Sequence, residues 1–161
     1  MLKTNLSGME IKNPIIPASG TFGYGQEYKD FYDINMLGSI SIKGTTLNMK
    51  LGNELPRIAE TRHGMINAIG LQNPGVKSVV NNELVELAKL VDYKVIANVG
   101  GSTIEEYIEC VKTIEKSPIV GIIELNVSCP NVSKGGIHFG TDIELLTNLI
   151  TSVKSVTNKP V

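Results

Sequence analysis

A fixed cation, four carboxamides and a thiol occur along the chain where they could bind and deprotonate a flat ligand. They are Lys43, Asn67, Asn98, Asn126, Asn131 and Cys129. A carboxamide donates and accepts hydrogen bonds together, which suits a heterocycle that carries both N–H and C=O groups. A cysteine whose pKa is lowered can act as a base or a nucleophile. These residue types favour an enzyme that positions a planar ligand, removes a proton with a thiolate and relies on an organic cofactor for the harder step.

Other catalytic arrangements are not evident in the sequence. No His/Asp pair stands out beside a nucleophile, and the carboxylates that could form an acid/base couple are scattered. The two cysteines, Cys110 and Cys129, fit neither a zinc pattern nor a disulfide framework. The sequence therefore predicts no metal site and a reducing, cytoplasmic setting.

Structural roles compete with the chemical ones. A lone cysteine is more often a buried structural thiol, which is the role we expect for Cys110 and the alternative for Cys129. Lys43 could pair with a nearby carboxylate such as Glu124. Asn67 could simply be a turn residue, as could Asn98, because asparagine is favoured in turns. Only their repetition at the ends of predicted strands favours a binding role.

Four predicted strands position these residues. They cover residues 14–18, 37–43, 94–98 and a run that begins near 122, and they end beside Ser19, Lys43, Asn98 and Asn126. Helices are predicted over 76–90, after Ser102 or Thr103, and from Thr141 or Asp142 to about 156; a hairpin is expected near the N-terminus, and either a functional loop or a small hairpin within 44–64. Residues 159–161 resemble the start of a fifth strand.

This order of elements predicts the fold class. Strands that alternate with helices imply an α/β fold with a parallel sheet, whose polar strand ends meet at one edge. In a (β/α)8 TIM barrel that edge holds the active site, and a whole barrel needs about 250 residues. The 161 residues are therefore expected to form about four βα units, the N-terminal half of a single TIM-barrel domain that covers residues 1–161.

Charge and hydropathy exclude two kinds of partner. The formal net charge is −1, and no cluster of basic residues appears, which argues against nucleic acid and against an anionic membrane surface. No apolar run approaches the ~20 residues of a membrane-spanning helix. We therefore expect a small-molecule ligand.

Five motifs in order resemble one family. The stretches NPIIPASGTFGYG, IKGTT, GMINAIGLQNPG, IANVGG and ELNVSCPN look like those of class 1 dihydroorotate dehydrogenases, the flavin-dependent barrels of pyrimidine (UMP) biosynthesis. The fuller stretches GNELPRIAET and NAIGLQNPG look most similar to class 1B. The resemblance implies oxidation of (S)-dihydroorotate to orotate, with Cys129 as the general base at C5 and hydride transfer from C6 to N5 of FMN.

The resemblance also assigns binding roles. Substrate contacts would come from Lys43, Asn67, Ala68, Ile69, Gly70, Leu71, Asn126 and Asn131, and FMN contacts from Ser19, Gly20, Lys43, Gly44, Asn98 and Asn126. Residues 131–140 would form a lid hinged at Gly135 and Gly136.

The class 1B likeness implies a partner. In that class an iron–sulfur flavoprotein with FAD and a 2Fe–2S cluster passes electrons to NAD⁺ within a heterotetramer, whereas class 1A relatives use fumarate. The FMN phosphate site of the family lies in later barrel loops, so these residues alone are expected to be an inactive fragment. The alternatives are another FMN barrel that acts on a different pyrimidine, and a half-barrel that has no activity.

Overall fold

The computed structural model describes residues 2–129 and 136–161. Two parallel strands form the centre of the fold, β5 (Val95–Val99) and β6 (Val120–Leu125). Residues 40–45 lie along the other side of β5, where Ser41 and Thr45 form parallel bridges with Ile96 and Val99. The central sheet is therefore parallel, as predicted from the alternation of strands and helices.

Two further segments extend this sheet on its outer sides. The Ser41 N–H donates to Pro17 O at 3.3 Å, which places the segment around Pro17 beside residues 40–45. The Ile123 N–H donates to Pro160 O at 2.9 Å, which places the segment around Pro160 beside β6. The order of segments across the sheet thus follows their order in the sequence. Consecutive βα units of a barrel have this arrangement.

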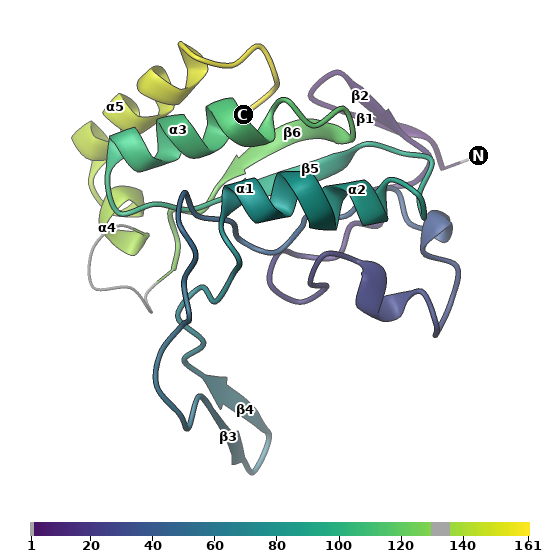
Figure 1. Cartoon of the computed structure of the whole chain (residues 1–161), viewed down its shortest axis with the longest axis horizontal. Coiled ribbons are helices and arrows are strands. Elements are labelled where there is room, and N and C mark those ends of the chain that lie inside the picture. Colours follow the sequence, from purple (N-terminus) through teal and green to yellow (C-terminus); the bar gives the residue numbers. More distant parts are fainter. Residues whose placement is uncertain (1, 130–135) are drawn as a thin grey trace.

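Helices cover one face of the sheet (Figure 1). Three consecutive helical pieces, α1 (Val76–Ser78), the π-helical η3 (Val79–Glu83) and α2 (Leu84–Leu87), precede β5. Helix α3 (Ile104–Ile114) joins β5 to β6, and α4 (Ile137–Gly140) and α5 (Ile143–Lys154) follow β6. The predicted caps are present: the Thr103 hydroxyl accepts from Glu106 N, and the Asp142 carboxylate accepts from Glu144 N and Leu145 N.

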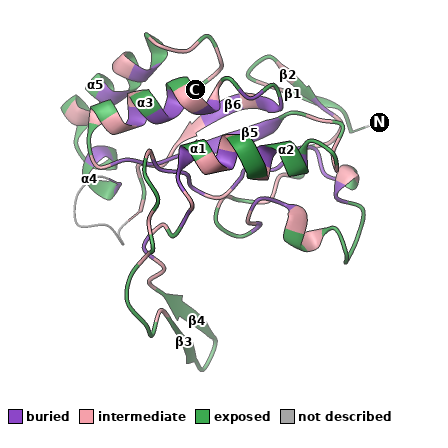
Figure 2. Ribbon diagram, in the orientation of Figure 1, coloured by how far each residue is buried: buried purple, intermediate pink, exposed green. Residues whose placement is uncertain are grey.

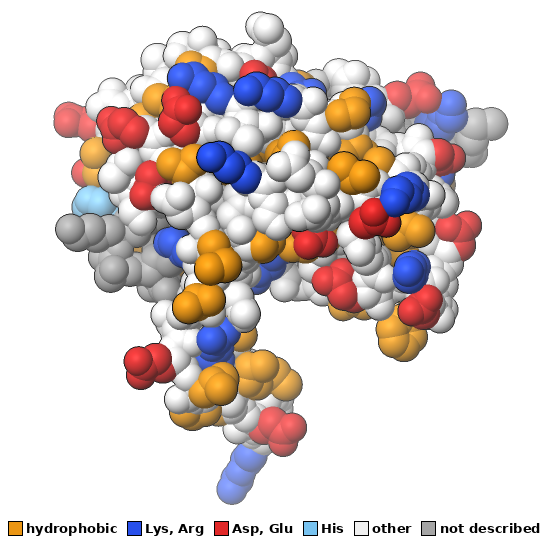
Figure 3. Space-filling view, viewed as in Figure 1, with side chains coloured by type: hydrophobic (Ala, Val, Ile, Leu, Met, Phe, Trp, Pro, Cys, Tyr) orange, Lys and Arg blue, Asp and Glu red, His pale blue; other side chains and the backbone are white. Residues whose placement is uncertain are grey.

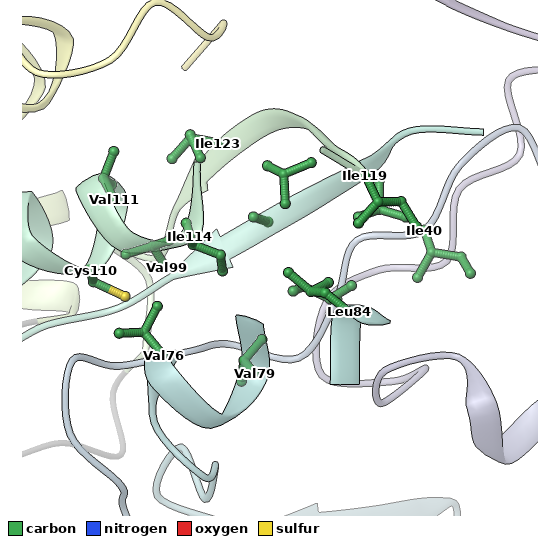
Figure 4. Packing of buried hydrophobic residues seen from close by; sticks show 14 of the residues in the cluster. Ile40, Val76, Val79, Leu84, Val99, Cys110, Val111, Ile114, Ile119 and Ile123 are labelled. Atoms are coloured by element: carbon green, nitrogen blue, oxygen red, sulfur yellow. The ribbon is translucent and has the colours of Figure 1, made fainter. Parts of the chain in front are cut away.

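The hydrophobic core lies between the sheet and these helices. Figure 4 shows Val99 and Ile123 from the strands packing near Val111 and Ile114 of α3. Alternate strand residues point to the other face, because side chains alternate along a strand. There Asn98 lies opposite Glu124 in the register of β5 and β6. One face of the sheet is thus packed by helices, and the other carries polar side chains.

Two antiparallel hairpins complete the fold. The first, β1 (Thr4–Leu6) with β2 (Met9–Ile11), confirms the hairpin predicted near the N-terminus. The second, β3 (Ile58–Thr61) with β4 (Gly64–Asn67), projects away from the sheet (Figure 1) and is exposed along its whole length (Figure 2). Short 3-10 helices, η1 (Gln26–Tyr28) and η2 (Ile34–Met36), lie in the N-terminal region.

The predicted fold class is confirmed, with differences in single elements. Residues 14–18 and 37–43 were expected to be strands, but they make isolated bridges and single hydrogen bonds instead of a continuous ladder. The helix predicted over 76–90 ends at Leu87. In the described residues the sheet does not close into a barrel, and it corresponds to about half of a (β/α)8 barrel. None of the helices within residues 2–129 and 136–161 is long and apolar enough to cross a membrane.

Candidate functional site at the strand ends

The carboxyl ends of the central segments bring three predicted site residues together. Gly44 is buried directly against the two amides, since a Cβ on Gly44 would lie 2.9 Å from Asn98 Oδ1 and 3.5 Å from Asn126 Nδ2. Any side chain at position 44 would therefore collide with Asn98. The bare glycine leaves no side chain of its own between a flat ligand and the two carboxamides.

A chain of side-chain hydrogen bonds orients the amides. Asn126 Nδ2 donates to Asn98 Oδ1 at 3.3 Å, and Asn98 Nδ2 donates to Glu124 Oε1. The Ser41 hydroxyl donates to the other Glu124 oxygen at 3.1 Å. Asn126 Oδ1 is buried and has no hydrogen-bond partner among the described residues. A buried acceptor without a partner is unusual in a folded protein and points to a missing donor.

Lys43 lies on the side of residues 18–21. The Lys43 ammonium group is 3.9 Å from the position that a Cβ would take on Gly20. The backbone N–H of Lys43 donates to Gly23 O at 2.8 Å. Ser19 and Gly20 belong to a turn in which Thr21 donates twice to the Ala18 carbonyl. No carboxylate in the described residues forms an ion pair with Lys43. The alternative of a Lys43–Glu124 pair is therefore not seen, and Glu124 is held by neutral groups instead.

Cys129 follows the end of β6 and is half-buried. Its carbonyl accepts from Ile137 N at 3.2 Å, which ties it to α4. Three residues earlier, the Asn126 carbonyl accepts from the Tyr107 hydroxyl of α3 at 2.7 Å. Tyr107 is fully buried, and burial raises the pKa of its phenol to about 12. Because the phenol stays protonated at neutral pH, it remains a donor that fixes the segment carrying Cys129.

The second thiol has a different environment. Cys110 lies in the core of α3 with 0% exposure, and its Sγ is 3.6 Å from Thr45 O. Burial raises the pKa of the Cys110 thiol to about 12. This cysteine therefore has the structural role predicted for it. Within the described residues, no group of three or more His, Cys, Asp or Glu side chains could hold a metal ion.

The predicted substrate loop is only partly brought to the strand ends. Leu71 lies there, because its methyl groups are 3.2 Å and 3.5 Å from the Cβ positions on Gly44 and Gly100. Ala68 and Ile69 are instead bound through their carbonyls by Asn53. Buried Gly70 packs on the same asparagine, since a Cβ there would lie 2.6 Å from Asn53 Oδ1.

One of the predicted substrate residues, Asn67, lies away from the strand ends. Asn67 is the last residue of β4, pairs with Ile58 and is exposed. In the described residues, no side-chain hydrogen bond joins it to the amides of Asn98 and Asn126. Asn131 and the first half of the predicted lid, residues 131–135, lie outside the described residues.

Sequence reasoning missed an anchor, Asn73. Its Oδ1 accepts from Thr46 N at 3.2 Å and Gly75 N at 2.9 Å. Its Nδ2 donates to Leu71 O at 2.7 Å and to the Thr46 hydroxyl at 2.9 Å. This one buried side chain joins the loop after residue 44 to the loop that presents Leu71. The signal that could have found it is the Asn-Pro-Gly sequence, because an asparagine in such a turn often binds backbone N–H groups.

Comparisons with known proteins identify the family of the chain. The family model "Dihydroorotate dehydrogenase" matches residues 1–161. A relative from Malacoplasma penetrans, named as the catalytic subunit of dihydroorotate dehydrogenase B (NAD(+)), is 54% identical over 99% of this chain and 52% of its own length. A relative of the same name from Anoxybacillus flavithermus is 56% identical over 99% of this chain and 51% of its own length.

A solved structure supports the fold independently. The dihydroorotate dehydrogenase of Eimeria tenella, crystallised with ferulenol, superposes with a TM-score of 0.76 at 22% identity, over 96% of this chain and 43% of that protein. This chain spans about half the length of the curated relatives that it matches. Since the family model covers every residue, the chain belongs to the dihydroorotate dehydrogenase family.

Proposed function

We propose that this chain supplies the proton-removing and amide-bearing side of an active site that oxidises (S)-dihydroorotate to orotate in UMP biosynthesis. The observation that carries the proposal is the pair of amides, Asn98 and Asn126, packed on the bare Gly44 at the strand ends. One of their oxygens has no partner within residues 2–129 and 136–161. The names of the relatives from M. penetrans and A. flavithermus support the same reaction.

The residues at the strand ends fit the ring system of FMN. Gly44 permits close approach of a flat ring, and the amides of Asn98 and Asn126 match its N–H and C=O groups. The Lys43 cation lies beside the turn that carries Ser19 and Gly20, which would complete the flavin contacts. When bound, FMN supplies a two-electron acceptor that takes up hydride.

The remaining chemistry belongs to this chain's own side chains. The Cys129 thiolate would accept the proton from C5 of dihydroorotate. The Lys43 ammonium would stabilise the negative charge that develops as the proton leaves. Asn126, Asn131 and the loop from Asn67 to Leu71 would hold the pyrimidine and its carboxylate. Leu71 already lies at the strand ends, whereas exposed Asn67 would have to approach them when substrate binds.

The electrons would leave through a second protein. The two relatives are named as NAD(+)-linked catalytic subunits, which supports a partner subunit. We infer that this partner is an iron–sulfur flavoprotein with FAD and a 2Fe–2S cluster, assembled with the catalytic subunit as a heterotetramer. Two free cysteines suit the reducing cytoplasm.

A visible spectrum tests this function. The chain would be joined to the half of the M. penetrans relative that the match does not cover, purified, and treated with dihydroorotate without oxygen. We expect flavin absorption that bleaches with dihydroorotate but not with dihydrouracil, which lacks the carboxylate. A flavoprotein that bleaches only with dihydrouracil would favour another pyrimidine enzyme. A folded protein that binds no flavin would contradict the proposal.

A further inference from the structure

The side-chain hydrogen bonds that join Glu124, Asn98 and Asn126 all donate toward Glu124. Glu124 accepts hydrogen bonds on both carboxylate oxygens, one from the Ser41 hydroxyl at 3.1 Å and one from Asn98 Nδ2. An ionised carboxylate has no proton to donate. Asn98 must therefore turn its NH2 group toward Glu124 and its carbonyl oxygen the other way.

The same constraint passes to Asn126. Its Nδ2 donates at 3.3 Å to the Asn98 oxygen, so its own oxygen must lie on the opposite side of the amide. That oxygen is the buried acceptor without a partner among the described residues. Glu124 thus determines, through Asn98, which end of the Asn126 amide is free.

Asn126 lies among the residues at the strand ends, close to Gly100 and Leu71. Asn126 Cβ lies 3.9 Å from the Cβ position on Gly100, and a Leu71 methyl lies 3.5 Å from that position. Leu71 is half-buried and has φ of 54°, a backbone conformation that leucine rarely adopts. The Asn126 oxygen is buried in this structure, so a ligand that binds it has to replace the atoms that now cover it.

We propose that Glu124 is a positioning residue that, through Asn98, holds the Asn126 amide with its oxygen ready to accept a ring N–H from the bound ligand. The identity of the ligand rests on the proposed function. A pyrimidinedione and the isoalloxazine ring of a flavin both carry such an N–H. The Asn126 oxygen should therefore bind either ring more tightly than an analogue of that ring without the N–H.

Glu124→Gln tests the proposal. A glutamine can donate as well as accept hydrogen bonds, so it no longer fixes which way the Asn98 and Asn126 amides are turned. Glu106→Gln is the matched control, since Glu106 is also half-buried and accepts a hydrogen bond, from Ser102 N at 2.6 Å. In the completed barrel described above, binding would be measured for orotate against N1-methylorotate and N3-methylorotate, and for FMN against 3-methyl-FMN.

We expect Glu124→Gln to lower the preference for one N–H ligand over its N-methyl analogue by about 10-fold, the effect of one hydrogen bond. The pair that responds identifies which ring supplies the N–H. Glu106→Gln should leave every preference unchanged. If Glu124→Gln also leaves every preference unchanged, the proposal is overturned.

A second measurement separates this proposal from the proposed function. In the ¹⁵N-labelled chain, the Asn126 side-chain NH2 signals can be assigned with Asn126→Asp. Glu124→Gln should shift them, although Glu124 reaches Asn126 only through Asn98, and Glu106→Gln should not. Unchanged Asn126 signals in Glu124→Gln would overturn the relay. If neither orotate nor FMN binds the unmodified protein, the proposed function fails, and the NMR comparison decides the relay by itself.

Discussion

Two regions of the molecule carry asparagines predicted to bind ligands, Asn98 the flavin and Asn67 the substrate, and they differ in what holds them. Asn98 is buried at the end of β5, where neighbouring strands and side chains fix it. Asn67 stands at the end of β4, in a hairpin whose eight strand residues are all exposed. The parallel sheet thus holds Asn98 at the strand ends. The hairpin pairs its two strands with each other but does not hold Asn67 at the strand ends.

The hairpin region also presents apolar side chains to solvent. Figure 3 shows orange side chains gathered on the part that projects downward, and Leu55, Met65 and Ile66 are 81%, 62% and 65% exposed. Its connection to the body depends on polar contacts at its base, such as Arg57 Nη1 to Gln72 Oε1 at 2.6 Å. Packing therefore stabilises the strand ends, and a few hydrogen bonds position the hairpin.

The largest expected effect is at the strand ends. In the completed barrel, Cys129→Ala should lower the turnover of dihydroorotate by about 10²–10⁴-fold, because general-base catalysis contributes on this order. FMN should remain bound, since the variant leaves the amides untouched. Cys110→Ala is the control, and its turnover per folded enzyme should stay within a few-fold. Retained turnover in Cys129→Ala would remove the thiol from the mechanism.

A large effect on stability is expected where the two regions join. Asn73→Ala should lower the free energy of unfolding by about 2–4 kcal/mol, because it leaves buried N–H groups of Thr46 and Gly75 without partners. Urea unfolding of the chain measures this. Asn82→Ala, which removes one exposed hydrogen bond to Ser78, should change the same quantity by less than about 0.5 kcal/mol. Equal losses in both variants would show that Asn73 is not an anchor.

A smaller effect is expected beneath Cys129. Tyr107→Phe removes the hydroxyl that binds Asn126 O and should cost about 0.5–1.5 kcal/mol. Tyr93→Phe removes a similar bond, 2.9 Å to Ile34 O, from a residue that precedes β5 and so lies near the opposite end of that strand from Asn98. Both variants should lose similar stability. Only Tyr107→Phe should change the rate at which Cys129 reacts with a thiol reagent, and equal rates would show that Tyr107 is structural alone.

The smallest effect is expected in the hairpin. The double variant Met65→Ser, Ile66→Thr should change the free energy of unfolding by less than about 0.5 kcal/mol, because both side chains are exposed. Ile123→Val, one methylene removed from the core, should cost about 0.5–1.5 kcal/mol. A larger loss in the hairpin variant than in the core variant would reverse the comparison between the two regions.

Local signals explain which parts of the fold were predictable. Helix caps were expected at Ser102 or Thr103 and at Thr141 or Asp142, and the structure has Thr103 and Asp142 as the caps. Capping depends on residues a few positions apart, which is why it was predictable. Asn98 and Asn126 were placed at one edge because parallel strands end together. The role of Glu124 was not predicted: its partners Asn98 and Ser41 lie 26 and 83 residues away in the sequence, so no local pattern joins them.

The loop from Asn67 to Leu71 shows a second limit. The motif is continuous in the sequence, so all its residues were assigned to one binding loop. In the structure, Asn53 and a left-handed Gly70 separate Leu71 at the strand ends from Asn67 in the hairpin. Such a division depends on tertiary contacts that residue types and spacing do not encode.

The different environments of the two thiols give the chain a single native site for chemical labelling. Cys110 is closed off in the core and its pKa is raised to about 12, whereas Cys129 is half-buried and follows the end of β6. A thiol-reactive fluorophore applied to the native chain near neutral pH should therefore attach at a single position. Without any engineered cysteine, the emission of the fluorophore would report directly on the environment at the end of β6. The fraction of Cys129 that a bound ligand protects from labelling would measure the fraction of molecules whose site is occupied.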